Sequence, residues 1–248
     1  MTEAEWLTCR SGSELGDLVK AQIGEGQRVT PRTWATARTL RLVEFAYCRR
    51  HTAGLAPVFL ELLTVAEQQV DAAGGRLAPT PLRARAHRAR RKLRDVDGLC
   101  FTRWYFATAV IIATTPSRAP FSLGGDLAMT CFEAVGRRAA WDGERMDWYG
   151  PAYRAAGEAE LAAQADVCRD IFGNPFCPAA FSPEWRTSTA VALASQMYES
   201  RDFGAMPILA DALQDAGCDN DDILNHCRDA KQVHVRGCWV VDLVLGKE

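Results

Sequence analysis

Apolar residues along this chain recur with the three- and four-residue spacing of a helix. In the clearest case they occupy positions i, i+3, i+4, i+7 and i+11, at Phe59, Leu62, Leu63, Ala66 and Val70. Such a stripe predicts an amphipathic helix with one buried face. Similar stripes occur within 161–172, 190–197 and 208–213, and no segment sustains the alternation of a strand. The sequence therefore predicts an all-α fold, either a multi-helix bundle or stacked helical hairpins.

Glycine and proline mark the expected helix ends. Gly74-Gly75 is predicted to end one helix, and Pro79-Thr80-Pro81 to begin the next. Gly173-Asn174-Pro175 predicts another end, because glycine accepts the left-handed conformation and proline prevents continuation. Four helices are expected after residue 183, at 187–200, 204–216, 220–229 and 235–245. In the last of them, Trp239-Val240-Val241 would also suit a strand.

The length and the charge pattern suggest two regions. A chain of 248 residues with 48% hydrophobic side chains can bury one large core or two small ones. We expect an N-terminal helical region at 1–165 and a C-terminal helical module at 166–248. Residues 1–124 carry 18 Lys and Arg against 11 Asp and Glu, whereas 125–248 carry 11 against 20. This polarity favours docking between the halves or recognition of a charged partner.

The two ends of the chain carry a resemblance to a known family. The chain begins Met-Thr-Glu-Ala-Glu-Trp-Leu, and its last eighty residues contain Arg169-Asp170-Ile171-Phe172-Gly173-Asn174-Pro175-Phe176, Arg236-Gly237-Cys238-Trp239-Val240-Val241-Asp242 and Leu245-Gly246-Lys247. These segments resemble an uncharacterised bacterial family with the same start and the same C-terminal module. No activity is attached to that family, so the resemblance implies a shared fold and no chemistry.

The densest cluster of charge is a basic segment with no acidic residue between Leu82 and Arg94. Its cations are Arg83, Arg85, Arg88, Arg90, Arg91, Lys92 and Arg94. On a helix they would surround an apolar face, and such a helix could bind phosphates of a nucleic acid or an acidic protein surface. The alternative is a solvated helix that pairs with the acidic C-terminal half.

A zinc site is the main candidate for bound metal. Cys218, Cys227, His234 and Cys238 have the residue types of a structural zinc site, and His234 and Cys238 have an acceptable half-site spacing. The nine-residue step from Cys218 to Cys227 is long for the other half, and His226 could take the place of Cys227. The alternative is that the cysteines are small core residues and that the histidine caps a helix.

Catalytic patterns are weak throughout. The Gly237-Cys238-Trp239 segment has a superficial likeness to the nucleophile segment of papain-like proteases. In those enzymes the base histidine lies far downstream of the cysteine, whereas only ten residues follow Cys238 here, so the same order of catalytic residues does not fit. The acids at 219–222 do not fit a calcium loop and suit the first turn of a helix instead. Phosphate-loop, dinucleotide, zincin and nucleophile-elbow motifs are absent from the sequence. No catalytic residue is predicted.

These observations lead to one functional hypothesis with two alternatives. We expect a non-enzymatic helical interaction protein, an adaptor or accessory subunit with a protein partner. The alternatives are a nucleic-acid-binding accessory protein that uses the basic helix at 82–94, and a zinc-stabilised helical module. No other cofactor is expected. The acidic residues near the N-terminus do not form an export signal, and the longest apolar run is too short for a membrane span, so we expect a cytoplasmic protein without membrane contact.

Overall fold

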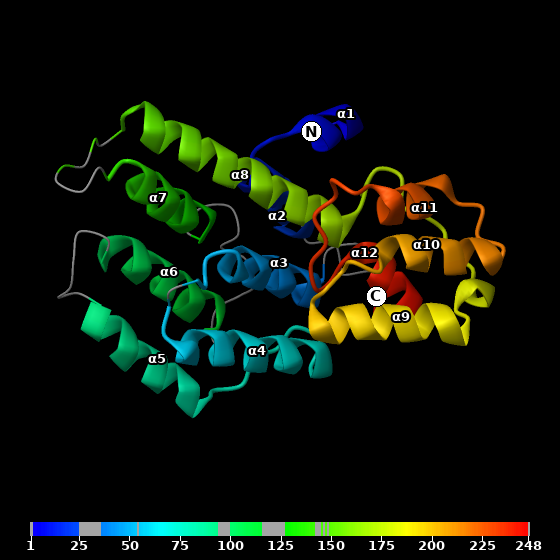
Figure 1. Ribbon diagram of the computed structural model, residues 1–248, viewed down its shortest axis with the longest axis horizontal. Helices are drawn as coiled ribbons and strands as arrows, with labels where there is room; N and C mark the ends of the chain where they lie inside the picture. The colour runs from blue at the N-terminus through cyan, green and yellow to red at the C-terminus, as the bar shows by residue number, and fades with distance from the viewer. Residues whose placement is uncertain are drawn as a thin grey trace. The chain divides into compact units, whose positions relative to one another are not determined.

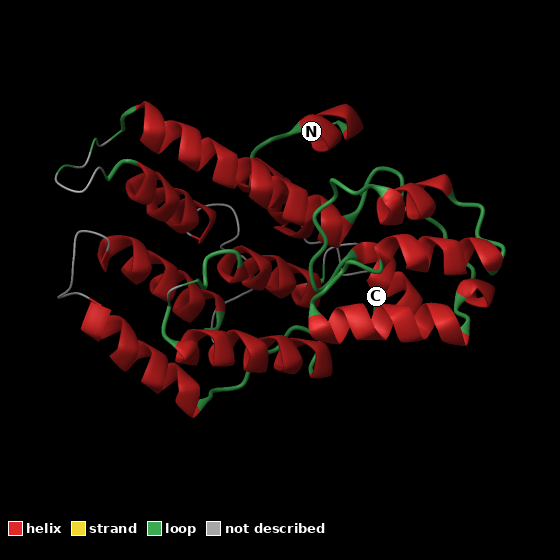
Figure 2. Ribbon diagram, viewed as in Figure 1, coloured by secondary structure: helices red, strands yellow, loops and turns green. Residues whose placement is uncertain are grey.

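A computed structural model describes residues 2–24, 36–53, 55–93, 100–115, 127–141, 145, 147 and 149–247. Every regular element among these residues is a helix, which confirms the predicted all-α fold (Figure 2). The chain forms two compact units. One contains residues 9–165, and the other contains 166–248 together with 1–8. The sequence-based division placed residues 1–8 with the N-terminal region, whereas here they belong with the C-terminal residues.

The unit of residues 9–165 is built around a buried helix. Its helices are α2 (Gly12–Gly24), α3 (Ala37–Arg49), α4 (Pro57–Ala72), α5 (Pro81–Lys92), α6 (Cys100–Ala113), α7 (Ala128–Ala139) and the first part of α8 (Pro151–Phe172) (Figure 1). Residues 38–48 of α3 are all buried, and α3 packs against α4, α6 and α7. This helix is therefore the centre of the unit.

The predicted helix ends in this unit are confirmed at α4 and α5. The five apolar residues of the α4 stripe are all at most 3% exposed. The α4 helix ends before Gly74 and Gly75, whose φ angles are positive. The α5 helix begins at Pro81, and the Thr80 hydroxyl accepts a hydrogen bond from the backbone N–H of Leu82. Local sequence chemistry thus accounts for where these helices start and stop.

The second unit combines the two ends of the chain. Its elements are α1 (Glu3–Thr8), the last part of α8, the short 3-10 helix η3 (Pro183–Trp185), α9 (Ser188–Ser200), α10 (Met206–Asp215), α11 (Asp221–Arg228) and α12 (Trp239–Leu245). Trp6 of α1 is fully buried, and its indole N–H donates to the Gly173 carbonyl. A core of apolar side chains from α9, α10, α11 and α12 fills this unit.

Three of the four predicted C-terminal helices agree closely with α9, α10 and α11. Asn220 caps α11 by accepting a hydrogen bond from the backbone N–H of Ile223, and Asp221 and Asp222 lie in its first turn, as the sequence predicted. The last helix starts at Trp239 rather than near 235, because Gly237 has a φ of 97° and Cys238 is the non-helical N-cap. The helical interpretation of Trp239-Val240-Val241 is confirmed. Within the described ranges, no helix is long and apolar enough to cross a membrane.

Candidate metal centre

Four side chains with metal-binding atoms meet inside the unit that contains residues 166–248. They are Asp170 near the end of α8, His226 on α11, His234 in the loop after α11, and Cys238 at the N-cap of α12. One ligand atom from each residue lies within 4.8 Å of the others. Three stretches of the chain, at 170, 226 and 234–238, therefore place these atoms around one point.

The local structure holds each segment in place. The αL conformation of Gly173 ends α8 three residues after Asp170. The loop that carries His234 is fixed by Arg236, whose Nη1 donates to the Tyr198 carbonyl and whose guanidinium lies 4.1 Å from the centre of the Tyr198 ring. This arginine is 7% exposed, so its contacts act in a largely dry environment.

The distances within the group are short. His226 Nε2 lies 3.2 Å from Cys238 Sγ and 3.2 Å from Asp170 Oδ1. His234 Nδ1 lies 3.0 Å from Asp170 Oδ1 and 3.9 Å from Cys238 Sγ. Zinc bonds of about 2.0–2.1 Å to nitrogen and about 2.3 Å to sulfur place neighbouring ligands of a tetrahedral site about 3.3–3.7 Å apart. The observed distances bracket this range, so these residues fit a tetrahedral metal ion.

The second carboxylate oxygen of Asp170 has a different role. It accepts a hydrogen bond of 2.8 Å from the backbone N–H of Val235, the residue that follows His234. This bond fixes the orientation of the carboxylate and leaves Oδ1 directed at the two imidazoles. Outer hydrogen bonds of this kind orient the ligands in metal sites.

The arrangement differs from a catalytic Cys-His-Asp triad. In a triad the histidine uses one ring nitrogen for the nucleophile and the other for the acid. Here the same nitrogen of His226 approaches both Cys238 and Asp170, and the same nitrogen of His234 approaches both as well. Cys238 is also fully buried. The group is therefore arranged to surround a shared centre.

Burial and hydrogen bonding set the charges in the group. Burial alone would raise the pKa of Asp170, but the hydrogen bonds from His226 and His234 lower it below the usual value. Burial raises the pKa of the Cys238 thiol well above its usual value, and the nearby Asp170 charge raises it further. A thiol in this environment stays protonated unless a cation compensates the thiolate.

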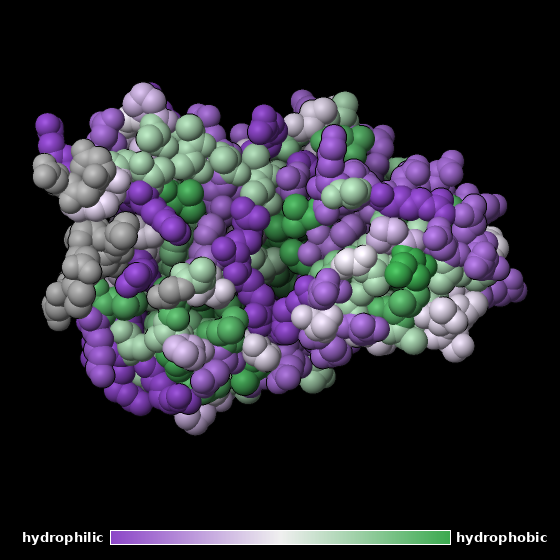
Figure 3. All heavy atoms as spheres, in the orientation of Figure 1, coloured by the Kyte–Doolittle hydropathy of each residue, from purple (hydrophilic) through white to green (hydrophobic). Residues whose placement is uncertain are grey.

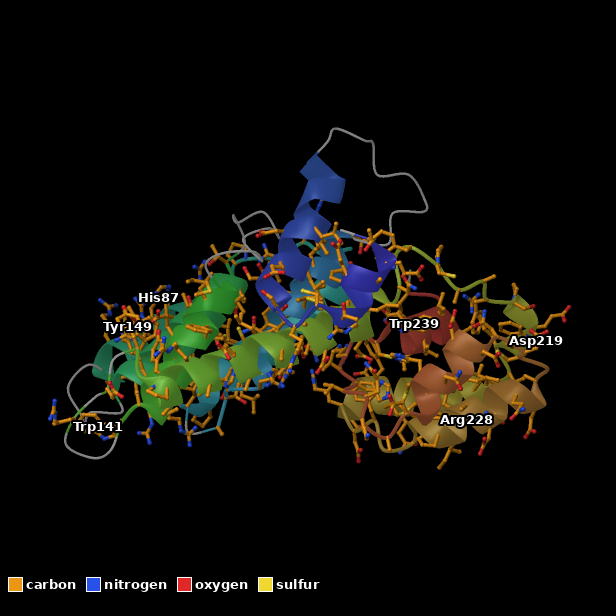
Figure 4. The ribbon with its side chains drawn as sticks, turned by 90° about the horizontal axis from the view of Figure 1, so that it is seen from above. His87, Trp141, Tyr149, Asp219, Arg228 and Trp239 are labelled. Atoms are coloured by element: carbon orange, nitrogen blue, oxygen red, sulfur yellow. The ribbon has the colours of Figure 1, made fainter. Side chains whose placement is uncertain are left out.

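A tryptophan completes the surroundings of His226. The indole N–H of Trp239 donates to His226 Nδ1 over 3.2 Å, and the centres of the two rings are 5.0 Å apart. Figure 4 shows Trp239 on α12 beside α11, the helix that ends at Arg228. Both ring nitrogens of His226 therefore have partners.

The group overlaps only in part with the four residues that the sequence singled out. It contains His234 and Cys238 but not Cys218 or Cys227, both of which lie in the apolar core of the unit. Burial raises the pKa of the Cys227 thiol to about 12, with Asp170 and Cys218 as lesser causes. His226, which the sequence offered as a substitute for Cys227, is present, and Asp170 was not foreseen.

The predicted basic segment forms α5, and its cations divide into two sets. Arg83 donates to the Thr115 hydroxyl, and Arg90 donates to the Thr108 hydroxyl and lies over the Trp104 ring. The exposed cations are Arg85, Arg88, Arg91 and Lys92, while Arg94 lies outside the described residues. Burial, followed by the charges of the neighbouring arginines, lowers the pKa of His87. Hydrophilic atoms cover the edge of the surface where α5 lies (Figure 3).

A second group with metal-ligand types lies in the other unit. His51 Nε2 is 2.9 Å from Glu160 Oε1, and Cys131 completes a set of three within 4.8 Å. The same carboxylate also contacts Arg50 Nη2 at 3.2 Å and accepts a hydrogen bond from Gln164 Nε2 at 3.0 Å. The carboxylate is therefore already neutralised by a protein cation.

Comparisons with known proteins add no further constraint. No protein-family profile, curated protein or solved structure matches this chain.

Proposed function

We propose that the unit containing residues 166–248 is a metal-stabilised helical module that binds one zinc ion. The ligands are Asp170 Oδ1, His226 Nε2, His234 Nδ1 and Cys238 Sγ. The observation that carries this proposal is the approach of all four atoms to one another within 4.8 Å. This is the zinc-stabilised alternative of the sequence analysis with two of its four ligands replaced.

The ligand types favour zinc over the hard cations. Thiolate and imidazole suit Zn²⁺, whereas Mg²⁺ and Ca²⁺ prefer sets made only of oxygen. One thiolate and one carboxylate also balance the charge of a divalent ion, while both histidines bind as neutral ligands. Charge balance matters because Asp170 and Cys238 have no measurable exposure.

The proposed role of the ion is structural. Four protein ligands fill a tetrahedral site, whereas a catalytic zinc keeps a position for water or substrate. The histidine side chains are 10% and 8% exposed, so little room remains for a substrate. The ion would join α8, α11, the following loop and α12, and its binding energy would add to the folding energy of the unit.

Cobalt substitution tests the ligand set directly. Titration of the metal-free full chain with Co²⁺ should give one tetrahedral equivalent per chain, with an intense visible absorption and a thiolate-to-metal band in the near ultraviolet. Cys238→Ser should abolish the thiolate band. Absence of tetrahedral cobalt absorption in the wild-type chain would remove the proposal.

Cys227 offers a matched control. It is also a buried thiol of the same unit, and it is adjacent in sequence to His226. Cys227→Ser and Cys218→Ser should both retain the thiolate band if the proposed ligands are correct. A weakened but persistent band in all three single variants, Cys218→Ser, Cys227→Ser and Cys238→Ser, would instead favour the ligand set expected from sequence, because two thiolates would remain in each.

For the whole chain we propose the role of an interaction protein, an adaptor or accessory subunit. The observation that favours it is the exposed basic face of α5, formed by Arg85, Arg88, Arg91 and Lys92. Within the described part of the chain, Arg85 pairs with Glu61 at 3.3 Å, and both of those side chains are about half exposed. Such a face is suited to an acidic protein surface.

Charge reversal tests this second proposal. Affinity purification of the tagged chain should recover a protein companion that is lost in the triple variant Arg88→Glu, Arg91→Glu and Lys92→Glu. Reversal of two exposed cations elsewhere, Arg154→Glu and Lys231→Glu, should retain it. Recovery of nucleic acid with a steep salt dependence would instead support the nucleic-acid alternative.

A further inference from the structure

Trp239 lies directly against the proposed metal site. It is the first residue of α12, next to the ligand Cys238, and its indole N–H donates to His226 Nδ1 over 3.2 Å. Its ring packs over Gly173, where an added Cβ would come within 3.2 Å of the indole. This packing places the ring beside His226, so the hydrogen bond between them is part of the metal-free folded unit.

This hydrogen bond dictates which nitrogen of His226 carries the proton. An indole N–H can only donate, so His226 Nδ1 must accept and must be unprotonated. The proton of the neutral ring is then on Nε2. That nitrogen faces Asp170 Oδ1 and Cys238 Sγ, each 3.2 Å away, and can donate to either. Without metal, the four groups and the indole thus form a consistent hydrogen-bonded network.

A metal ion on His226 Nε2 requires the opposite arrangement. The lone pair of Nε2 then binds the metal, and the proton of the neutral ring moves to Nδ1. Two N–H groups, one from the indole and one from the imidazole, would face each other with no acceptor between them. The metal and the observed hydrogen bond therefore cannot coexist.

We infer that Trp239 is a positioning residue that lowers the metal affinity of the site, because its hydrogen bond to His226 must break before the ion binds. This inference rests on the proposed zinc site. It predicts that the indole turns away from His226 in the metal-bound chain. It also predicts that removal of the indole N–H makes metal binding tighter, although Trp239 is adjacent to a ligand.

The affinity of the full chain for Co²⁺, measured by competition with a chelator, tests the inference. Trp239→Phe and Trp239→Leu both remove the donor, and each should bind Co²⁺ about threefold to tenfold more tightly than wild type, the fold-change that corresponds to one hydrogen bond. Trp185→Phe is the control, because this partly buried tryptophan of the same unit packs against Phe181 instead. Its affinity should equal that of wild type.

Nuclear magnetic resonance of the His226 ring nitrogens gives a test that needs no variant. The metal-free chain should show the proton on Nε2, and the zinc-loaded chain should show it on Nδ1. A proton on Nδ1 in the metal-free chain, or equal Co²⁺ affinity in wild type and both Trp239 variants, would overturn the inference and leave the metal site standing. Failure of every chain to bind Co²⁺ would overturn the metal site itself.

Discussion

The two units each bury a group of histidine, cysteine and carboxylate side chains, and we propose a metal site at only one of these two groups. The group of His51, Cys131 and Glu160 has three possible ligand residues, and its carboxylate is shared with Arg50 and Gln164. The group around Asp170 has four possible ligand residues of the same three types, and both of its histidines contact the same carboxylate oxygen. Residue types alone do not distinguish these groups.

The decisive difference is the source of positive charge. In the unit of residues 9–165 a guanidinium lies 3.2 Å from Glu160, so a metal ion there would be repelled by Arg50 and would compete with it for the carboxylate. Among the described residues, the Asp170 carboxylate contacts two imidazoles and a backbone N–H, and the Cys238 thiol belongs to the same group. The negative charge of a buried carboxylate must be compensated. Arg50 contributes to this in one unit, whereas imidazoles and a backbone N–H do so in the other.

Metal removal should produce the largest effect and should separate the two units. At the proposed zinc site, free zinc at about a thousand times its dissociation constant would add about 4 kcal/mol to the stability of the unit containing Asp170. Chelation should remove this gain and lower the denaturant midpoint of that unit. The near-ultraviolet circular dichroism of the unit measures this midpoint. The transition of the unit of residues 9–165 should not move, and a common shift of both transitions would contradict the comparison.

Glu160→Gln should have the next largest effect. Burial opposes the charge of Glu160, but His51, Gln164 and Arg50 together lower its pKa below the usual value. Loss of these charge-assisted contacts should cost about 1–3 kcal/mol at pH 7, as measured by urea unfolding.

The pH dependence of this variant provides the control. A lowered pKa in the folded state contributes stability above the unfolded pKa of about 4.3, and the contribution is lost as the pH falls through the folded pKa. The difference between wild type and Glu160→Gln should therefore be constant above about pH 5 and shrink at lower pH. A difference that does not depend on pH would show that packing, not charge, is responsible.

Arg50→Met should have the smallest of the three effects, because the second metal site that it opens is weak, and it tests the role of the guanidinium. Removal of this cation leaves His51, Cys131 and Glu160 without a competing charge, so the variant should bind a second, weaker equivalent of Co²⁺. The matched change Arg49→Met removes the adjacent cation, which pairs with Glu67 instead. It should add no second equivalent, and equal behaviour of the two variants would refute the explanation.

Local sequence patterns were sufficient to predict the class of the fold and several helix limits. Periodicity and capping residues predicted the end of α4, the start of α5 and both limits of α9, α10 and α11, because these features depend on neighbours within a few residues. The start of α12 was not predictable in this way. His234 and the backbone N–H of Val235 both contact Asp170 of α8. The path of the chain just before α12 therefore depends on contacts with a distant helix.

Only part of the candidate site could be predicted from the sequence, for the same reason. His234 and Cys238 are four residues apart, so their proximity has a local origin. Asp170 lies 56 residues before His226, and no local pattern links them. One signal could have distinguished His226 from Cys227: Ile223, Leu224 and Cys227 form the buried face of α11, which turns His226 to another side.

X-ray absorption at the zinc edge of the zinc-loaded full chain tests the central claim most directly, because it reports the ligand atoms themselves. The account predicts one sulfur at about 2.3 Å and three nitrogen or oxygen atoms at about 2.0–2.1 Å. Three sulfurs and one nitrogen would instead identify Cys218, Cys227, His234 and Cys238 as the ligands. Six oxygen or nitrogen neighbours without sulfur would indicate adventitious zinc and contradict the proposed site.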